Sequence, residues 1–151
     1  MRQINPIIVL CLSISLVMAR PVSYAQENET PIIILCGGAE LSVEIAADPK
    51  SRDYGLMNRE SLPKGSGMLF VYPSMRACRL WMKNTYIPLS AAFIDIDGRI
   101  LEIIDMEKIN SAKIYRSNAK AKYALEVPLG WFAENGVNPG DYCDIPDIKS
   151  R

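Results

Sequence analysis

The chain has 151 residues, of which 17 are acidic, 17 are basic and none is histidine. This length fits one domain with a working hydrophobic core, so we expect no second domain. The lack of histidine excludes a Ser-His-Asp triad, a Cys-His pair and a histidine-ligated zinc ion. The chain has no Walker loop, no GxGxxG motif and no CxxC pair, so we expect neither a metal nor a cofactor.

The N-terminal stretch has the pattern of a secretory signal peptide. Arg2 is an early cation, an apolar run extends from Ile7 to Met18, and Ser23 and Ala25 are the small residues of a cleavage site. The run is shorter than the roughly 20 apolar residues that span a bilayer, and an uncleaved anchor is the alternative. We expect an exported protein, periplasmic or extracellular, with no transmembrane segment after signal removal. The predicted organisation is a signal peptide at 1–25, a flexible leader at 26–31 and a single β-rich domain at 32–151.

Three cysteines follow the predicted signal peptide, namely Cys36, Cys78 and Cys143. In an oxidising compartment an odd number of cysteines allows at most one internal disulfide. Cys36 lies in the first expected strand and Cys143 in the last, and the terminal strands of a small β domain are often neighbours. We favour a Cys36–Cys143 disulfide, with three unpaired cysteines as the alternative because spacing does not fix connectivity.

The first part of the domain predicts a hairpin and a short helix. Residues 32–36 are apolar, a glycine pair follows, and residues 41–45 alternate between apolar and polar side chains, which is typical of two paired strands. Asp48 and Pro49 suit the N-cap and the first position of a helix, which should end between residues 55 and 58.

The middle of the chain predicts four strands. Residues 68–72 form an apolar strand that a proline ends, and residues 79–83 form a second one. Residues 89–96 and 99–106 are long β-rich runs on either side of Asp97-Gly98, a strong signal for a hairpin with a two-residue turn.

The last part of the chain predicts a loop, two short strands and a helical turn. We expect an exposed loop at 108–122, a strand at 123–127, a helical turn at 131–135 and a closing strand at 142–145. The expected fold is therefore mainly β, at the margin of α+β: a compact antiparallel β-sandwich or barrel-like domain with two short helices. The loop holds Lys108, Lys113, Arg116, Lys120 and Lys122 without an acid. These cations predict either a solvated surface or contact with an anionic envelope polymer, and no nucleic acid is expected as a partner.

The predicted hairpin places two carboxylates on one face. With a two-residue turn Ile94 faces Leu101, and Asp95 and Glu102 become diagonal neighbours. Such a pair could serve as acid and base in a hydrolase that acts on carbohydrate. The alternative is a solvated sheet face, where acids are common.

Trp81, Lys83, Asn84 and Thr85 form a second candidate site. An indole, a cation, an amide and a hydroxyl at a strand end suit the binding of a polar ligand such as a sugar or an anion. The alternative is a core tryptophan, a solvated lysine and a turn in which Asn84-Thr85 bonds to its own backbone.

Several motifs occur in order along the chain, namely Gly55-Leu56-Met57-Asn58-Arg59, Gly67-Met68-Leu69-Phe70, Trp81-Met82-Lys83-Asn84-Thr85, Pro88-Leu89, Asp97-Gly98, Leu125-Glu126 and Gly130. Together they resemble the prokaryotic family called domain of unknown function 192. The resemblance covers nearly all of the predicted domain, and it implies a small, often exported, mostly β protein whose biochemical role is not established.

The chain departs from the family pattern at two positions, and the charged residues of the shared motifs predict one ion pair. Ser90 stands where the family usually has an acid, and Leu80 stands where it usually has an aromatic residue. Among the charged residues of the shared motifs, a buried Arg59 would require an anionic partner, for which Glu126 is the natural candidate. The two residues either pin the short helix to the sheet or line one pocket with the Trp81 group.

These observations favour a non-catalytic binding or accessory module for a polar small molecule, a glycan or an envelope component. The candidate ligand-binding residues are Arg59, Trp81, Lys83, Asn84, Thr85 and Glu126. A hydrolase that uses Asp95, Glu102 or Glu126 is one alternative. A protein-interaction domain with an exposed apolar or basic surface is the other.

Overall fold

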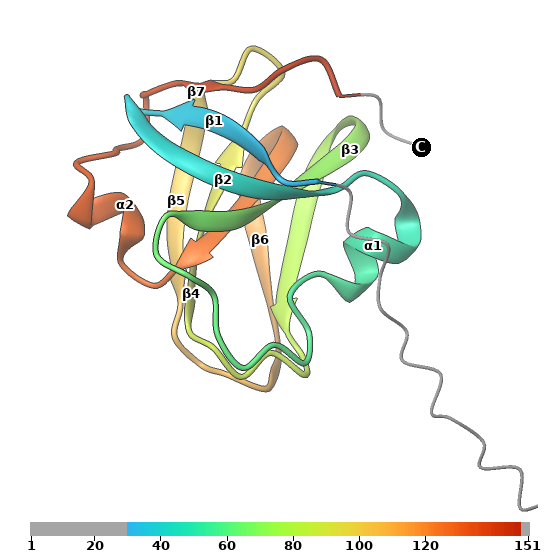
Figure 1. The fold of residues 1–151 in the computed structure, drawn as a ribbon. Coiled ribbons are helices and arrows are strands. Elements are labelled where there is room, and N and C mark those ends of the chain that lie inside the picture. Colours follow the sequence, from blue (N-terminus) through green and yellow to red (C-terminus); the bar gives the residue numbers. More distant parts are fainter. Residues whose placement is uncertain (1–29, 149–151) are drawn as a thin grey trace, which may run out of the picture.

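The structure is a computed structural model that describes residues 30–148, so the predicted signal peptide and the first four leader residues lie outside the described residues. No helix within residues 30–148 is long and apolar enough to cross a membrane. Figure 1 shows the elements. They are β1 (Ile32–Cys36), β2 (Ala39–Ala46), α1 (Pro49–Tyr54), β3 (Ser66–Met82), β4 (Leu89–Ile94), β5 (Ile100–Met106), β6 (Ser111–Pro128), α2 (Trp131–Glu134) and β7 (Cys143–Asp144).

The strands form one sheet in the order β5-β4-β6-β3-β2-β1-β7. The mainly β fold with two short helices is therefore confirmed. The antiparallel arrangement holds except between β2 and β3, which pair in parallel, because α1 and the following loop carry the chain back to the same end of the sheet. A single backbone bridge between Arg99 and Tyr142 brings the two edges of the sheet together without closing a barrel.

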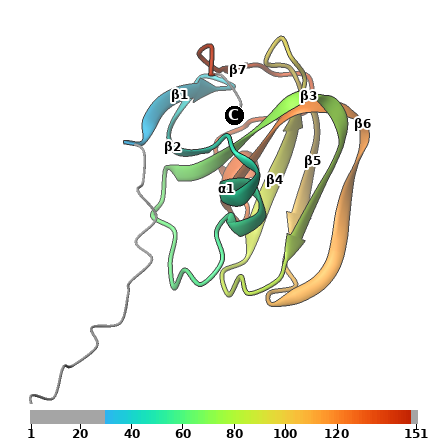
Figure 2. The same cartoon turned by 90° about the vertical axis from the view of Figure 1, so that its right-hand side faces the viewer.

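The long pair β3 and β6 differs most from the prediction. Pro73 does not end the strand, since β3 continues to Met82. Proline lacks a backbone N–H, but it lies where the β3–β6 register shifts between Val71 and Arg76, so no regular ladder bond is lost. The prediction of a loop at 108–122 is wrong beyond residue 110, because residues 111–122 belong to β6. We call the paired segments 76–82 and 111–121 the arm, which curves along one side of the molecule (Figure 2).

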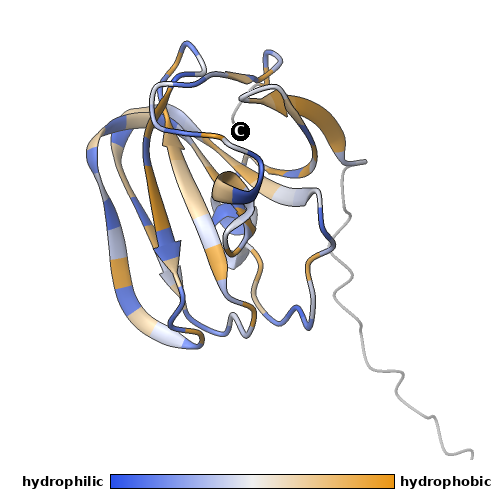
Figure 3. Ribbon diagram, turned by 90° about the vertical axis from the view of Figure 1, so that its left-hand side faces the viewer, coloured by the Kyte–Doolittle hydropathy of each residue, from blue (hydrophilic) through white to orange (hydrophobic). Residues whose placement is uncertain are grey.

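The central strands are buried on both faces. On one face Leu69, Leu125 and Val127 join a core cluster that α2 covers with Trp131 and Phe132. On the other face a second cluster is built around the residues that alternate with these in sequence, including Met68, Phe70, Phe93 and Ala124, together with Leu56 after α1. Strands buried on both faces read as continuous apolar runs, and the middle of the sheet has this character in Figure 3.

The predicted hairpin at Asp97-Gly98 is present with a longer turn. The Asp95 N–H donates to the Arg99 carbonyl at 3.0 Å, which leaves a three-residue loop. Ile94 consequently pairs with Ile100 instead of Leu101, after a register shift. Gly98 has a φ of 86°, and a Cβ there would overlap the carbonyl oxygen of Cys143. Glycine is therefore required both by the backbone angle and by the close approach of β7.

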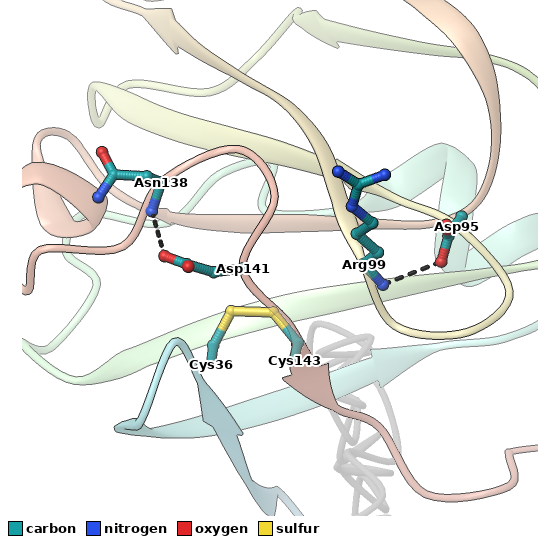
Figure 4. The surroundings of a disulfide bond; sticks show 6 residues. All are labelled: Cys36, Asp95, Arg99, Asn138, Asp141 and Cys143. Atoms are coloured by element: carbon teal, nitrogen blue, oxygen red, sulfur yellow. Dashed lines mark hydrogen bonds between the residues drawn. A yellow bond between two sulfur atoms is a disulfide. The ribbon is translucent and has the colours of Figure 1, made fainter.

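A disulfide joins the two terminal strands of the described domain. Cys36 of β1 lies opposite Cys143 of β7, and their sulfur atoms are bonded (Figure 4). Cys78 is free and buried. The bond connects positions that are 107 residues apart, which in the chain-entropy account restricts the unfolded state strongly.

Replacing both Cys36 and Cys143 by serine should lower the free energy of unfolding by about 2–5 kcal/mol, because the unfolded chain regains the conformations that the cross-link removes. Urea unfolding with and without a thiol reductant measures this loss. The reductant should shift the wild-type curve toward that of the double variant and leave the double variant unchanged. An equal response of both proteins would contradict the assignment.

Candidate functional site

A pocket of about 310 Å³ lies between α1 with its following loop and the arm. Its apolar walls come from Leu56, Phe70 and Leu80, all of which belong to the second core cluster. Its rim carries Tyr54, Trp81 and Ile114, which are all exposed. The polar and charged lining residues are Arg52, Asp53, Arg79, Thr85 and Glu126.

Among these residues Glu126 is unusual, because it is an acidic side chain buried in the core of the sheet. It lies in the centre of the sheet, where β6 pairs with Met68 of β3 and Ala91 of β4, and its exposed fraction is only 4%. No group within residues 30–148 donates a hydrogen bond to its carboxyl. Burial raises the pKa of Glu126 to about 8, because a carboxylate loses its hydration in an apolar environment. At neutral pH the side chain is therefore mostly a neutral carboxylic acid.

Two further titratable side chains of the second core cluster, Tyr72 and Cys78, are also neutral. Burial raises the pKa of Tyr72 far above its usual value, and the neighbouring Cys78 and Glu126 add to this effect. Burial likewise raises the pKa of the Cys78 thiol to about 11. These side chains therefore act as hydrogen-bonding groups instead of ions at neutral pH.

Arg52 forms a fixed part of the wall. Its Nη1 donates to the carbonyl oxygens of Ala47 at 2.5 Å and of Val71 at 3.0 Å, and its guanidinium lies 5.8 Å from the centre of the Tyr72 ring. These contacts tie α1 to β2 and β3. Because the two carbonyls satisfy part of its hydrogen-bonding capacity, Arg52 positions the helix as well as contributing positive charge.

The mouth of the pocket is positively charged on the side of the arm. Arg79 and Trp81 lie two residues apart on the same face of β3. Their partners on β6 are Arg116 and Ile114, respectively. Two arginines therefore face each other, and neither forms an ion pair with an acid within residues 30–148. Like charges directly opposite each other on a sheet repel, and a bound anion relieves that repulsion. Asp53 is the acid among the lining residues at the rim.

The structure brings Trp81, Thr85 and Glu126 of the predicted binding residues into this pocket. Thr85 is buried, and its hydroxyl donates to the Lys83 carbonyl at 3.3 Å. Lys83 places its ammonium 5.2 Å from the centre of the Trp81 ring. Asn84 has a φ of 52° and its carbonyl accepts from the Asn58 N–H at 2.8 Å. It therefore forms a turn, which is the alternative role that the sequence predicts for it.

Arg59 does not meet Glu126, so the predicted ion pair between them is wrong. Its guanidinium instead donates to both carboxylate oxygens of Glu44, at 2.5 and 2.7 Å. The short loop after α1 returns Arg59 toward the exposed face of β2, whereas Glu126 lies in the buried centre of the sheet. The hydrogen bond and the attraction from Glu44 raise the pKa of Arg59 against the opposing effect of its burial.

The two predicted acids, Asp95 and Glu102, have separate structural roles. Asp95 accepts hydrogen bonds from the backbone N–H groups of Asp97 and Arg99, both at 2.9 Å, and so shapes the turn. Glu102 accepts from the backbone and the side chain of Asn118 at 3.0 and 2.8 Å, which links β5 to the arm. Neither residue lines the pocket.

Ser90 does not line the pocket, because it pairs with Val127 and so lies on the opposite face of the sheet from Glu126. Its hydroxyl donates to Asp105 at 2.6 Å and accepts from the Gly130 N–H at 2.9 Å. Ser90 therefore connects β4 to β5 and to the turn before α2. An acid at this position could not donate to Asp105 while ionised, so this contact depends on the hydroxyl.

Sequence reasoning missed Arg52, Tyr54, Arg79 and Ile114. Arg79 and Trp81 are two residues apart, a spacing that places both on one face of a strand. This spacing is sufficient to predict that Arg79 lies beside Trp81. Ile114 has no such signal, because its segment has the pattern of a loop. Arg52 and Tyr54 reach the pocket only because α1 packs over β3, which local pattern does not reveal.

The lining of the pocket combines polar, charged and apolar groups. Within residues 30–148 no group of three or more His, Cys, Asp or Glu side chains is placed to hold a metal ion. The pocket offers a neutral carboxyl at its base, apolar and aromatic walls and guanidinium groups at its mouth.

The buried Glu126 should make stability depend on pH. The unfolded side chain loses its proton near its ordinary pKa of 4.5, whereas the folded one keeps it to about 8. Between these values the unfolded state binds fewer protons, so the free energy of unfolding falls as pH rises, by up to about 4 kcal/mol. Glu126→Gln should therefore be more stable than wild type above pH 8, with the difference shrinking toward pH 5.

Urea unfolding at several pH values measures this difference. Glu60→Gln, which changes an exposed loop residue in the same way, should retain the pH dependence of wild type. A Glu126→Gln curve that runs parallel to the wild-type curve would show that Glu126 keeps an ordinary pKa.

Comparison with known proteins gives a family and no biochemical role. The family DUF192, described as uncharacterized ACR, matches residues 32–145. A comparison with curated proteins found no match.

Two similar solved structures come from bacteria. A protein from Sinorhizobium meliloti 1021, described as a putative transcription regulator, is 36% identical, with 76% of this chain and 91% of that chain covered and a TM-score of 0.71. A protein of unknown function from Novosphingobium aromaticivorans DSM 12444 is 26% identical, with 83% and 90% covered and a TM-score of 0.72. The match over the whole sheet confirms the resemblance seen in the motifs: the chain belongs to the DUF192 family.

Proposed function

We propose that this protein is an exported, non-catalytic binding domain that takes a small anionic molecule into the Glu126 pocket. The observation that carries the proposal is the buried Glu126 carboxyl, which lines the pocket without a hydrogen-bond partner within residues 30–148. No side-chain polar atom sealed from solvent within residues 30–148 lacks a partner, so the Glu126 carboxyl oxygens are accessible from the pocket. A molecule that enters the pocket can therefore supply the hydrogen bonds that the protein does not.

The charge distribution supports an anionic ligand. A protonated Glu126 offers one O–H donor and one carbonyl acceptor at the base of the pocket. Arg79, which faces Arg116 across the strand pair, offers positive charge at the mouth, and guanidinium groups match carboxylate and phosphate groups geometrically. A volume of about 310 Å³ is at the small end for ligand pockets. These features fit a compact organic acid or phosphate ester with a hydroxyl or carbonyl group at its other end.

An enzyme with Glu126 as a general acid is the second candidate. A pKa of about 8 lies close to neutral pH, where a general acid is most effective. Glycoside hydrolysis in its usual form also needs a second carboxylate beside the first. Asp53, the other acid of the lining, is exposed on α1 at the rim. The surroundings of Glu126 therefore support binding more strongly than hydrolysis.

A thermal-unfolding screen against organic acids, phosphate esters, sugar acids and neutral sugars tests the proposal. A ligand at 100 times its dissociation constant adds about 2.7 kcal/mol to stability, which raises the midpoint by several degrees in a domain of this size. We expect anionic compounds to raise the midpoint and neutral sugars to leave it unchanged. For the compound with the largest effect, calorimetry should show Arg79→Gln binding at least tenfold more weakly, since a charge-assisted hydrogen bond is lost.

Arg99→Gln is the matched control, because Arg99 is exposed and does not line the pocket. Binding to wild type should also weaken as pH rises through about 8, where Glu126 loses its proton and repels the anion, and Glu126→Gln should remove this pH dependence. Equal binding by Arg79→Gln and Arg99→Gln would reject the pocket. Turnover of the bound compound, lost in Glu126→Gln, would favour the enzyme.

A further inference from the structure

The exposed apolar residues of the arm gather at one end of the molecule. The loop 83–88, between β3 and β4, and the loop 107–110, between β5 and β6, lie side by side, because the Asn110 N–H donates to the Thr85 carbonyl at 2.7 Å. Figure 1 shows both loops at the end of the molecule that is opposite the turn at 95–99. We call these two loops, with the adjoining strand ends, the tip.

The tip exposes large apolar side chains. The exposed fractions are 51% for Tyr86, 46% for Ile109, 45% for Ile114 and 41% for Trp81. Trp81 and Ile114 face each other across the β3–β6 ladder, so they form one continuous apolar surface. Single exposed apolar residues are ordinary on a soluble protein, but a group of four from two separate stretches of the chain indicates a contact surface.

Positive charge surrounds this apolar surface. The stretches 61–94 and 108–125 contain no acid at all. At the tip Lys83 lies over the Trp81 ring, Lys108 precedes Ile109, and Lys113 lies 4.5 Å from the centre of the Tyr115 ring. Glu107 is the one acid in the two loops. Farther along the arm, Arg79 and Arg116 extend the positive surface.

From this combination we infer that the tip docks the protein on the surface of an anionic phospholipid bilayer. Lysines attract the phosphates of acidic lipids. Tryptophan and tyrosine settle at the level of the headgroups, where their rings are half in water and half in hydrocarbon. Isoleucines at the same end reach toward the acyl boundary. The two isoleucines favour a bilayer over an anionic polysaccharide or nucleic acid, because the acyl region of a bilayer buries an exposed aliphatic side chain, whereas the hydrated charged surface of a polyanion leaves it in water.

The docking surface and the pocket are adjacent. Trp81 and Ile114 belong to both, so a docked protein presents the mouth of the pocket toward the lipid headgroups. Glu126 lies in the buried sheet and has no part in the docking surface. Docking and ligand binding are therefore separable by mutation.

Vesicle binding tests the inference, with protein purified after expression of the full-length gene, so that every variant shares the same N-terminal processing. Vesicles of phosphatidylcholine with about one-third phosphatidylglycerol are compared with pure phosphatidylcholine by co-sedimentation and by tryptophan emission. Trp131 is buried, so a blue shift of the emission reports the transfer of Trp81 into the headgroup region. We expect binding and a blue shift with the anionic vesicles only, both weakened when salt rises well above about 0.1 M.

Two sets of variants separate charge from apolar contact. Changing Lys83, Lys108 and Lys113 to glutamine should lower the partition coefficient about a hundredfold, at roughly fivefold for each cation. Ile109→Ser should lower it about tenfold through lost apolar burial. Arg99→Gln and Ile96→Ser are the matched controls at the opposite end, where Ile96 is also exposed, and they should bind like wild type. Glu126→Gln should also bind vesicles like wild type.

Three results would overturn the inference. The first is absence of binding to anionic vesicles by the wild type. The second is equal loss in the tip variants and in the controls at the turn. The third is binding to heparin or duplex DNA as strong as to the vesicles and insensitive to Ile109→Ser, which would identify the tip as a general polyanion site.

Discussion

The pairing of β3 with β6 is the constraint on which the rest of the structure depends. One half of each strand runs through the centre of the sheet and divides the hydrophobic core into two clusters. The other half leaves the sheet as the arm and forms one wall of the pocket. The register shift between Val71 and Arg76 separates the two halves. The same two strands therefore provide the burial that stabilises the domain and the exposed surface on which its proposed contacts lie.

Glu126 shows how closely stability and function are connected in this arrangement. It occupies a position on β6 between Met68 and Ala91 of the neighbouring strands, where an apolar residue would serve the core better. The desolvation that raises its pKa is a cost to folding, and the same desolvation keeps the carboxyl neutral and able to donate a hydrogen bond. The protein loses stability at this position and gains a neutral carboxyl that can donate a hydrogen bond.

Much of the fold could be predicted from local pattern. The capped helix α1 follows from Asp48 and Pro49, and the hairpin of β1 and β2 follows from a glycine pair between apolar runs. The first half of β6 could not be predicted, because its inward residues include Tyr115, Ser117 and Ala121, which make no apolar period. The parallel pairing of β2 and β3 leaves no local signal either. Of the pocket, Trp81, Thr85 and Glu126 could be selected from the sequence, whereas Arg52 and Arg79 become relevant only through tertiary packing.

The three cysteines of the described domain allow three different disulfide pairings, and the folded structure contains the pairing of Cys36 with Cys143. Cys78 lies between the other two along the chain, so an unfolded chain meets it sooner than the distant partner. Once the arm has closed, the Cys78 thiol is buried and its pKa stands at about 11, which leaves almost no thiolate to attack a disulfide. In the folded protein the arm therefore protects the Cys36–Cys143 disulfide from exchange with the third cysteine, which β1 and β7 hold apart from this pair.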